Sequence, residues 1–213
     1  MVVLILNSTW ANLFVTMSIT IRAAQVADAT PTINYIFSSG PAAFDYVFQQ
    51  SKPFLQESFS RGRSQFGFQN HHVALLNEQV VASIACFDRN EAQSMEMGCI
   101  LDMLKFYRWR FPFAAIRGLR FECIVPKPVK HSLYIAHLGV AEQCRGQGVG
   151  KQLIAWAINK AEAQGYQSVS LDVAKSNPLA EKLYISLGFK QIAYRKSSIT
   201  GISDHATLLY RLR

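Results

Sequence analysis

The sequence is poor in cysteine, and its few cysteines are not spaced for a disulfide framework or a metal site. Its 213 residues contain no CxxC pair, and the four cysteines are Cys86, Cys99, Cys123 and Cys144. This pattern indicates reduced thiols of a cytosolic protein and argues against structural zinc. Intrinsic disorder is excluded as well, because 50% of the residues are apolar, which is enough for the core of one domain.

The apolar N-terminus lacks the features of a signal peptide and of a membrane span. Residues 1–19 have no Lys or Arg ahead of the apolar stretch and fall short of about 20 uninterrupted apolar residues. The interruptions are polar side chains: Asn7, Ser8, Thr9, Asn12 and Thr16. Met17 begins MSITIRAAQVAD, which is typical of the start of a cytosolic domain. We therefore expect residues 1–16 to be an extension outside the fold, residues 17–213 to form the domain, and the protein to be cytoplasmic.

Acidic residues are scarce, and the positive charge is concentrated in one segment. The chain has 22 Lys+Arg against 14 Asp+Glu, a net charge of +8. Residues 105–130 contain seven basic residues and one acid, Glu122, so this segment carries +6. The basic residues are Lys105, Arg108, Arg110, Arg117, Arg120, Lys127 and Lys130. The segment is either a solvated helix face or a site for an anionic partner, whether nucleic acid, a membrane or a phosphorylated cofactor.

Hydrophobic periodicity predicts alternating strands and helices with no repeat or linker between them. The expected strands are residues 18–23, 72–76, 80–87, 132–140, 168–173, 189–195 and 206–211. A first helix starts near Asp28, and the others are expected at residues 42–49, 53–60, 91–105, 113–120, 148–164 and 178–187. This order indicates one α/β or α+β domain with a mixed sheet. Large apolar residues at near-helical spacing in the basic segment are expected to pack into the core: Phe106, Trp109, Phe113, Ile116, Leu119 and Phe121.

A glycine-rich loop, VAEQCRGQGVGK at residues 140–151, lies between a predicted strand and a predicted helix. Glycine lets the backbone turn sharply and approach a ligand, and a helix start offers unpaired N–H groups and a positive dipole end. These features are typical of a phosphate or pyrophosphate cradle. The spacing excludes a Walker A loop, because Arg145 and Gln152 replace the first glycine and the hydroxyl. It also excludes G-x-G-x-x-G, because Lys151 or Leu153 stands where the third glycine belongs.

Arg145, Gly148 and Gly150 form Arg-x-x-Gly-x-Gly, which resembles the loop of the GNAT N-acetyltransferase superfamily. Leu138-Gly139-Val140 upstream matches the family's apolar strand, and the segment from Asn177 through Tyr184 to Gly188-Phe189 matches its downstream block. The resemblance is close over residues 132–195 and looser over residues 18–88. It implies a single GNAT-like domain with a central, mostly antiparallel mixed sheet flanked by helices. Residues 91–130 depart from a minimal GNAT domain, and we interpret them as a helical insertion.

The resemblance also implies the chemistry of the site. Acetyl-CoA is the expected acyl donor and no metal is required. The residues expected to bind it are Leu138, Gly139, Val140, Arg145, Gly146, Gln147, Gly148, Val149, Gly150, Lys151, Asn177 and Tyr184. Tyr184 is further expected to protonate the departing CoA thiolate, since a phenol remains protonated at neutral pH. The backbone of residues 138–140 is expected to hold the pantetheine arm and to stabilise the developing oxyanion.

Three of these residues also have a purely structural interpretation. Asn177 is a good helix N-cap ahead of Pro178, Tyr184 could be a core aromatic, and Gly139 could mark a bulge. His137 is the main candidate for a general base, but strand alternation could equally turn it to the other face. Glu122 and a water relay are the alternatives for that role. His71 and His72 are interpreted as strand-edge residues.

The sequence therefore predicts an acetyl-CoA-dependent N-acetyltransferase that acts on a primary amine by direct transfer. The alternative is a non-catalytic acyl-CoA-sensing or nucleic-acid-associated module with the same fold. The acceptor is expected to be a small amine or a peptide, and the basic insertion favours one with an acidic group beside the amine. A third interpretation of that insertion is a membrane-surface helix. A homodimer is compatible with the sequence.

Overall fold

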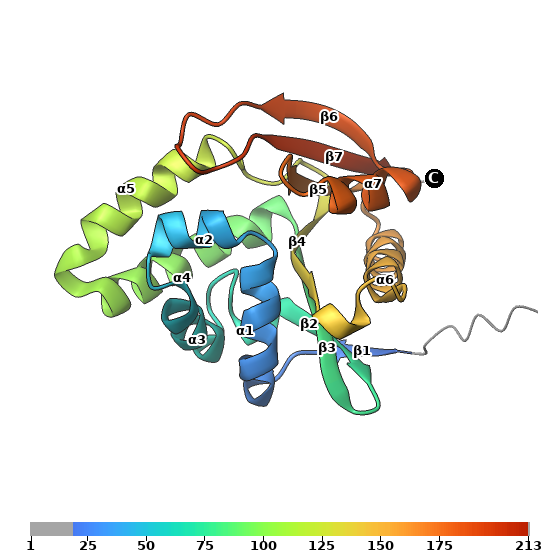
Figure 1. Cartoon of the computed structure of the whole chain (residues 1–213), viewed down its shortest axis with the longest axis horizontal. Coiled ribbons are helices and arrows are strands. Elements are labelled where there is room, and N and C mark those ends of the chain that lie inside the picture. Colours follow the sequence, from blue (N-terminus) through green and yellow to red (C-terminus); the bar gives the residue numbers. More distant parts are fainter. Residues whose placement is uncertain (1–18, 213) are drawn as a thin grey trace, which may run out of the picture.

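The computed structural model describes residues 19–212, and a seven-stranded sheet forms its centre (Figure 1). The strands follow the order β1-β2-β3-β4-β5-β7-β6. They are β1 (Thr20–Ala23), β2 (His71–Leu76), β3 (Gln79–Phe87), β4 (Ser132–Val140), β5 (Ser168–Ala174), β6 (Lys190–Arg195) and β7 (His205–Arg211). β4 and β5 pair in parallel and their neighbours pair antiparallel, which confirms the mixed, mostly antiparallel sheet. The predicted extension at residues 1–16 lies outside the described residues.

Helices cover both faces of this sheet. They are α1 (Ala29–Ser38), α2 (Pro41–Phe48), α3 (Ser51–Arg61), α4 (Arg89–Tyr107), α5 (Phe111–Glu122), α6 (Val149–Ala163) and α7 (Pro178–Ser186). Short 3-10 helices connect them: η1 (Val26–Asp28), η2 (Phe68–Asn70), η3 (Arg108–Arg110) and η4 (Glu142–Cys144). Every predicted strand and helix is present, with bounds that differ by a few residues at most. No helix among residues 19–212 is both long and apolar enough to cross a bilayer.

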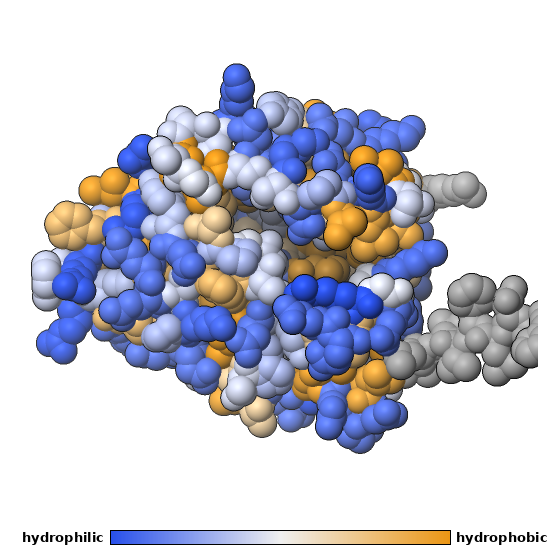
Figure 2. Space-filling view, in the orientation of Figure 1, coloured by the Kyte–Doolittle hydropathy of each residue, from blue (hydrophilic) through white to orange (hydrophobic). Residues whose placement is uncertain are grey.

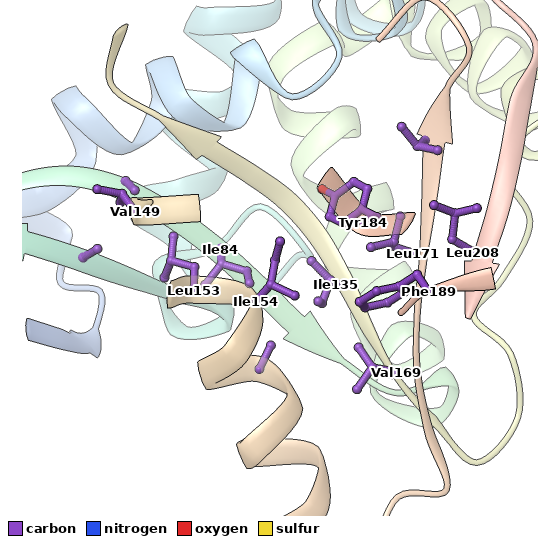
Figure 3. Packing of buried hydrophobic residues seen from close by; sticks show 14 of the residues in the cluster. Ile84, Ile135, Val149, Leu153, Ile154, Val169, Leu171, Tyr184, Phe189 and Leu208 are labelled. Carbon is purple, nitrogen blue, oxygen red and sulfur yellow. The ribbon is translucent and has the colours of Figure 1, made fainter. Parts of the chain in front are cut away.

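The helices form two groups, one on each face of the sheet (Figure 1), and each group packs on a main apolar core. On one face, α6 packs Leu153 and Ile154 against Ile84, Ile135 and their strand neighbours (Figure 3). On the other face, α1, α2 and α3 form a second core with the strands and with the α4–α5 pair. Val149, Leu153, Ala157 and Ala161 are buried and recur every four residues on α6, so the helix buries one stripe and leaves its other side in solvent.

The helical insertion between β3 and β4 is confirmed as two helices, α4 and α5. Asp88 caps α4 by accepting from the backbone N–H groups of Asn90 and Glu91, and Pro112 lies in the first turn of α5. The expectation that the apolar residues of this segment pack into the core is wrong for four of them. Trp109, Phe113, Ile116 and Leu119 are exposed, because α5 meets the protein body mainly through Ala114.

Candidate active site

The glycine loop joins the end of β4 to the start of α6, as the sequence predicts. Gly148 is the N-cap of α6 and has φ +84°. This left-handed conformation is unfavourable for any residue other than glycine. A Cβ placed on Gly146 or Gly148 would meet no protein atom within 4 Å, so their free sides face open space. The first turn of α6 directs N–H groups that have no carbonyl partner in the helix toward the same end. The loop therefore provides an open, glycine-lined cradle at a helix N-terminus, which fits a pyrophosphate.

The side chains of the loop have two different roles. Arg145 folds back, and its Nε donates to the Val140 carbonyl at 3.2 Å, which links the loop to the end of β4. Gln147 donates to the Gln143 carbonyl at 2.7 Å, within the loop. Lys151, in contrast, is exposed in the first turn of α6 and adds positive charge beside the cradle.

β4 and β5 separate beside this loop. Their ladder contains only the pairs from Ser132↔Ser168 to Tyr134↔Ser170, after which β4 continues to Val140 without pairing to β5. The surface is hollowed at this place, over β4 (Figure 2). On this edge, the backbone N–H and C=O groups of residues 135–140 are not paired with β5. A strand that binds the pantetheine arm needs backbone groups that are free in this way.

Tyr184 lies on α7 beside this opening. Its ring packs edge-on against Phe189 at 5.8 Å between centroids, and its hydroxyl is turned away from Phe189 (Figure 3). Burial raises the pKa of Tyr184 to about 12, so the phenol keeps its proton at neutral pH. Among residues 19–212, no group hydrogen-bonds this hydroxyl. A buried phenol whose hydroxyl lacks a protein partner at an opening is suited to donate to a ligand.

Asp172 is a candidate that the sequence argument missed. It lies on β5, two residues beyond the last β4–β5 pair, and its side chain is 4% exposed. Its carboxylate accepts from the Tyr134 hydroxyl at 3.0 Å and from the Thr207 hydroxyl at 2.6 Å, and Arg195 is 4.0 Å away. Burial nevertheless raises the pKa of Asp172 above the usual Asp range.

Tyr134 links β4 to Asp172. The Tyr134 phenol donates to Asp172. Burial raises the pKa of Tyr134 well above its usual value, and the nearby Asp172 carboxylate raises it further. The hydrogen-bonded pair lies at the point where β4 and β5 separate, and Tyr184 packs in the apolar core of the same two strands. The sequence gives no local signal for this pairing, because Asp172 is a single acid within a strand.

His137 is half-buried, and its ring is turned into an aromatic cluster. It has φ +52° at a bulge in β4, and its ring lies 5.1 Å from Phe66, 5.7 Å from Phe44 and 5.9 Å from His71. Burial lowers the pKa of His137 to about 3, and its Nε2 has no hydrogen-bond partner among the described residues. The imidazole is therefore neutral at pH 7 and a weak base. A base role for His137 stays a prediction, and this environment argues against it.

Gly139 is needed for packing between β4 and α1. A Cβ at this position would lie 2.2 Å from the Tyr35 carbonyl oxygen, so the close approach that glycine permits here is to the backbone of α1. A side chain would have to push α1 away from the strand that carries the opening.

We expect Gly139→Ala to lower the free energy of unfolding by about 1–3 kcal/mol, the usual cost of overpacking. Gly118→Ala is the matched control, since a Cβ there lies in ordinary contact, 3.9 Å from Val47. That change should raise the stability by about 0.5–1 kcal/mol, because Gly118 is inside α5. Urea unfolding followed by circular dichroism measures both. Equal stability of the two variants would contradict this account of Gly139.

Four other residues named in the sequence argument have structural roles or are exposed to solvent. Asn177 is the N-cap of α7, and its Oδ1 accepts from the Ala180 N–H at 3.2 Å, so its structural role is present. Glu122 is exposed at the end of α5. Arg117 donates its Nε–H to the Val47 carbonyl at 3.0 Å, at the C-terminal end of α2, and Arg120 is exposed. Neither arginine supports the expected preference for an acidic acceptor, which stays a prediction.

The family model of the Acetyltransferase (GNAT) family matches residues 36–189. The chain belongs to the GNAT acetyltransferase family. Over 61 residues it is 41% identical to the [ribosomal protein bS18]-alanine N-acetyltransferase of Haemophilus ducreyi, a match that covers 29% of this chain and 42% of that protein. The chain spans less than half the length of the curated relatives that it matches.

Solved structures share the GNAT fold along nearly the whole chain. A crystal structure of an acetyltransferase superposes with a TM-score of 0.64 at 20% identity, covering 91% of this chain and 100% of that one. The NatC complex bound to Gag peptide and CoA has a TM-score of 0.53 at 15% identity, covering 92% of this chain and 100% of that one. At these identities the likeness shows the fold, and acetyl-CoA is the donor typical of the family.

Proposed function

We propose that this GNAT protein is an N-acetyltransferase that transfers the acetyl group of acetyl-CoA directly to a primary amine. The observation that supports this most strongly is the pairing of an open glycine cradle at the α6 N-terminus with the β4–β5 separation beside it. Acetyl-CoA supplies an activated acetyl group on a thioester and leaves as the CoA thiol. The loop at residues 145–151 holds its pyrophosphate, and the free edge of β4 holds its pantetheine arm.

Two side chains carry the proton transfers in this proposal. Tyr184 donates its phenolic proton to the departing thiolate, and its raised pKa keeps that proton available at neutral pH. Asp172 accepts the proton that the amine loses as it attacks, either directly or through a water molecule. Its raised pKa makes it a better proton acceptor than an ordinary aspartate. Tyr134 and Thr207 fix the orientation of the Asp172 carboxylate.

The acceptor side of the opening is closed at one end. Ile124, which follows α5, packs with Ile199 and Ile202 of the β6–β7 loop, and Tyr46 of α2 packs against the same cluster. This contact joins α2, α5 and the β6–β7 loop across the sheet end (Figure 1). An acceptor therefore enters from the remaining side and presents the end of its own chain to the site. We therefore propose a small primary amine or a peptide N-terminus as the acceptor, in preference to a lysine within a polypeptide.

Acetyl-CoA binding on the glycine loop is tested by Gly148→Val. The new side chain would occupy the open cradle, so we expect calorimetry to detect no acetyl-CoA binding. Gly165→Val is the matched control, because Gly165 also has a positive φ, +75°, and open space around its Cβ, but it follows the opposite end of α6. Both variants carry a similar backbone strain, on the order of 1–2 kcal/mol. Unchanged affinity of Gly148→Val, or equal loss in both variants, would contradict the assignment.

A further inference from the structure

η3 and the outer face of α5 expose large apolar side chains that no described residue covers. Trp109 is 74% exposed, Phe113 60%, Ile116 57% and Leu119 65%. The adjoining helix α4 packs against α5 and exposes Met97, Ile100, Leu101 and Leu104. Orange and pale-orange side chains between blue ones lie over α5 at the left edge of Figure 2. An apolar surface of this kind is unusual for a monomer in water and indicates an interaction site.

Positive charge adjoins this face. The basic segment, residues 105–130, holds +6 of the chain's net +8, and its basic residues on η3 and α5 are Arg108, Arg110, Arg117 and Arg120. Arg110 lies over the Trp109 ring, 5.0 Å from its centroid, so a cation and an exposed aromatic are adjacent. Arg120 is exposed on α5, next to Leu119 and one turn after Ile116. Cationic side chains therefore adjoin the exposed apolar ones on η3 and α5.

A cavity of about 450 Å³ lies at the N-terminal end of this face. The rings of Phe106, Trp109 and Phe113 line it together with Arg110 and Arg117. Aromatic walls beside two guanidinium groups suit a molecule that joins an apolar chain to a phosphate.

We propose that η3 and the outer face of α5 bind the surface of a membrane that contains anionic lipid. Exposed Trp, Phe and Ile side chains next to Arg and Lys are what an interfacial helix needs to insert apolar groups and to attract anionic headgroups. Single-stranded nucleic acid explains the face less well, because the exposed aliphatic side chains of α4 and α5 offer no stacking surface to a base. A second copy of the chain is disfavoured too, because a two-fold contact would place two +6 segments against each other.

The emission of Trp109 tests this proposal directly. The sequence contains three tryptophans, so Trp10→Phe/Trp156→Phe leaves Trp109 as the only indole. We expect its emission to shift to shorter wavelength with vesicles of phosphatidylcholine and phosphatidylserine at low salt. The shift should be absent with phosphatidylcholine alone and should be reversed by added salt. Sedimentation with vesicles would be less informative, because residues 1–16 are apolar and could bind lipid themselves.

A pair of double variants in this background locates the surface. Phe113→Ser/Ile116→Ser should weaken vesicle partitioning at least about tenfold, since two apolar side chains no longer insert. Val26→Ser/Ile192→Ser removes two residues of similar exposure, 49% and 51%, from η1 and β6, and it should leave partitioning unchanged. The proposal is overturned if anionic vesicles at low salt cause no Trp109 shift, or if the two double variants partition alike. A shift caused by single-stranded DNA and not by vesicles would also overturn it and would assign the face to nucleic acid.

Discussion

Tyr184→Phe is expected to slow acetyl transfer by about 10²–10⁴-fold at neutral pH, with little change in acetyl-CoA affinity. The variant loses one hydroxyl, which has no hydrogen-bond partner among residues 19–212, and it keeps the ring that packs against Phe189. The fold should therefore be as stable as before, because no protein hydrogen bond is broken. Steady-state turnover of an accepted amine, together with calorimetry of acetyl-CoA binding, measures the two effects separately.

Tyr35→Phe is the matched control for this result. Tyr35 is also partly buried near β4, but its hydroxyl donates to the Val80 carbonyl at 2.9 Å. We expect this variant to lose about 1 kcal/mol of stability and to keep its turnover. If Tyr184→Phe turns over at the wild-type rate, Tyr184 is a core aromatic and the thiolate is protonated by another group.

Asp172→Asn is expected to reduce kcat/KM about a hundredfold or more, because an amide cannot accept the proton of the amine. In the wild type, kcat/KM should fall as the pH drops through the raised pKa of Asp172, since the protonated carboxyl no longer acts as a base. The contribution of Asp172 to that limb should be absent from the variant, whereas the titration of the acceptor amine, which must be neutral to attack, is common to both. The difference between the two pH profiles thus reports the ionisation of this one carboxylate.

The stability of Asp172→Asn distinguishes a base from a structural residue. An acid whose pKa is higher in the folded state binds its proton more tightly there, so ionisation at neutral pH destabilises the fold. The neutral Asn variant should therefore be at least as stable as the wild type at pH 7. Tyr134→Phe removes a hydrogen bond to Asp172 but keeps the carboxylate, so it should retain most of the activity. Equal losses in Asp172→Asn and Tyr134→Phe would mean that Asp172 only positions its neighbours.

Much of the architecture could be predicted because its signals are local. Strand alternation, helical spacing and the turn at residues 146–150 each depend on a few neighbouring residues, so the order of elements and the glycine loop were predictable. The N-cap role of Asn177 was predictable for the same reason, because Pro178 follows it directly. The roles of Tyr184 and of the loop in binding acetyl-CoA depend on a ligand and stay predictions.

Other features depend on contacts between distant segments. Asp172 acquires its environment from Tyr134 on β4 and Thr207 on β7, which no window of sequence contains. His137 is turned into an aromatic cluster by a bulge that the alternation of β4 does not predict. The spacing of Phe113 and Ile116 is equally compatible with a buried face and with an exposed one, and only the packing of α5 through Ala114 decides between them.

The insertion is also part of the second core, and this limits how the family's domains can be recombined. Phe87 and Tyr134 are direct partners across β3 and β4, so a short turn would suffice to join these strands. The two inserted helices nevertheless contribute Met103 and Ala114 to the cluster around Phe54. A chimera that exchanged α4 and α5 for a hairpin would leave Phe54 and its neighbours open to water. A chimera between two relatives therefore has to take α2, α3 and the insertion from the same parent protein.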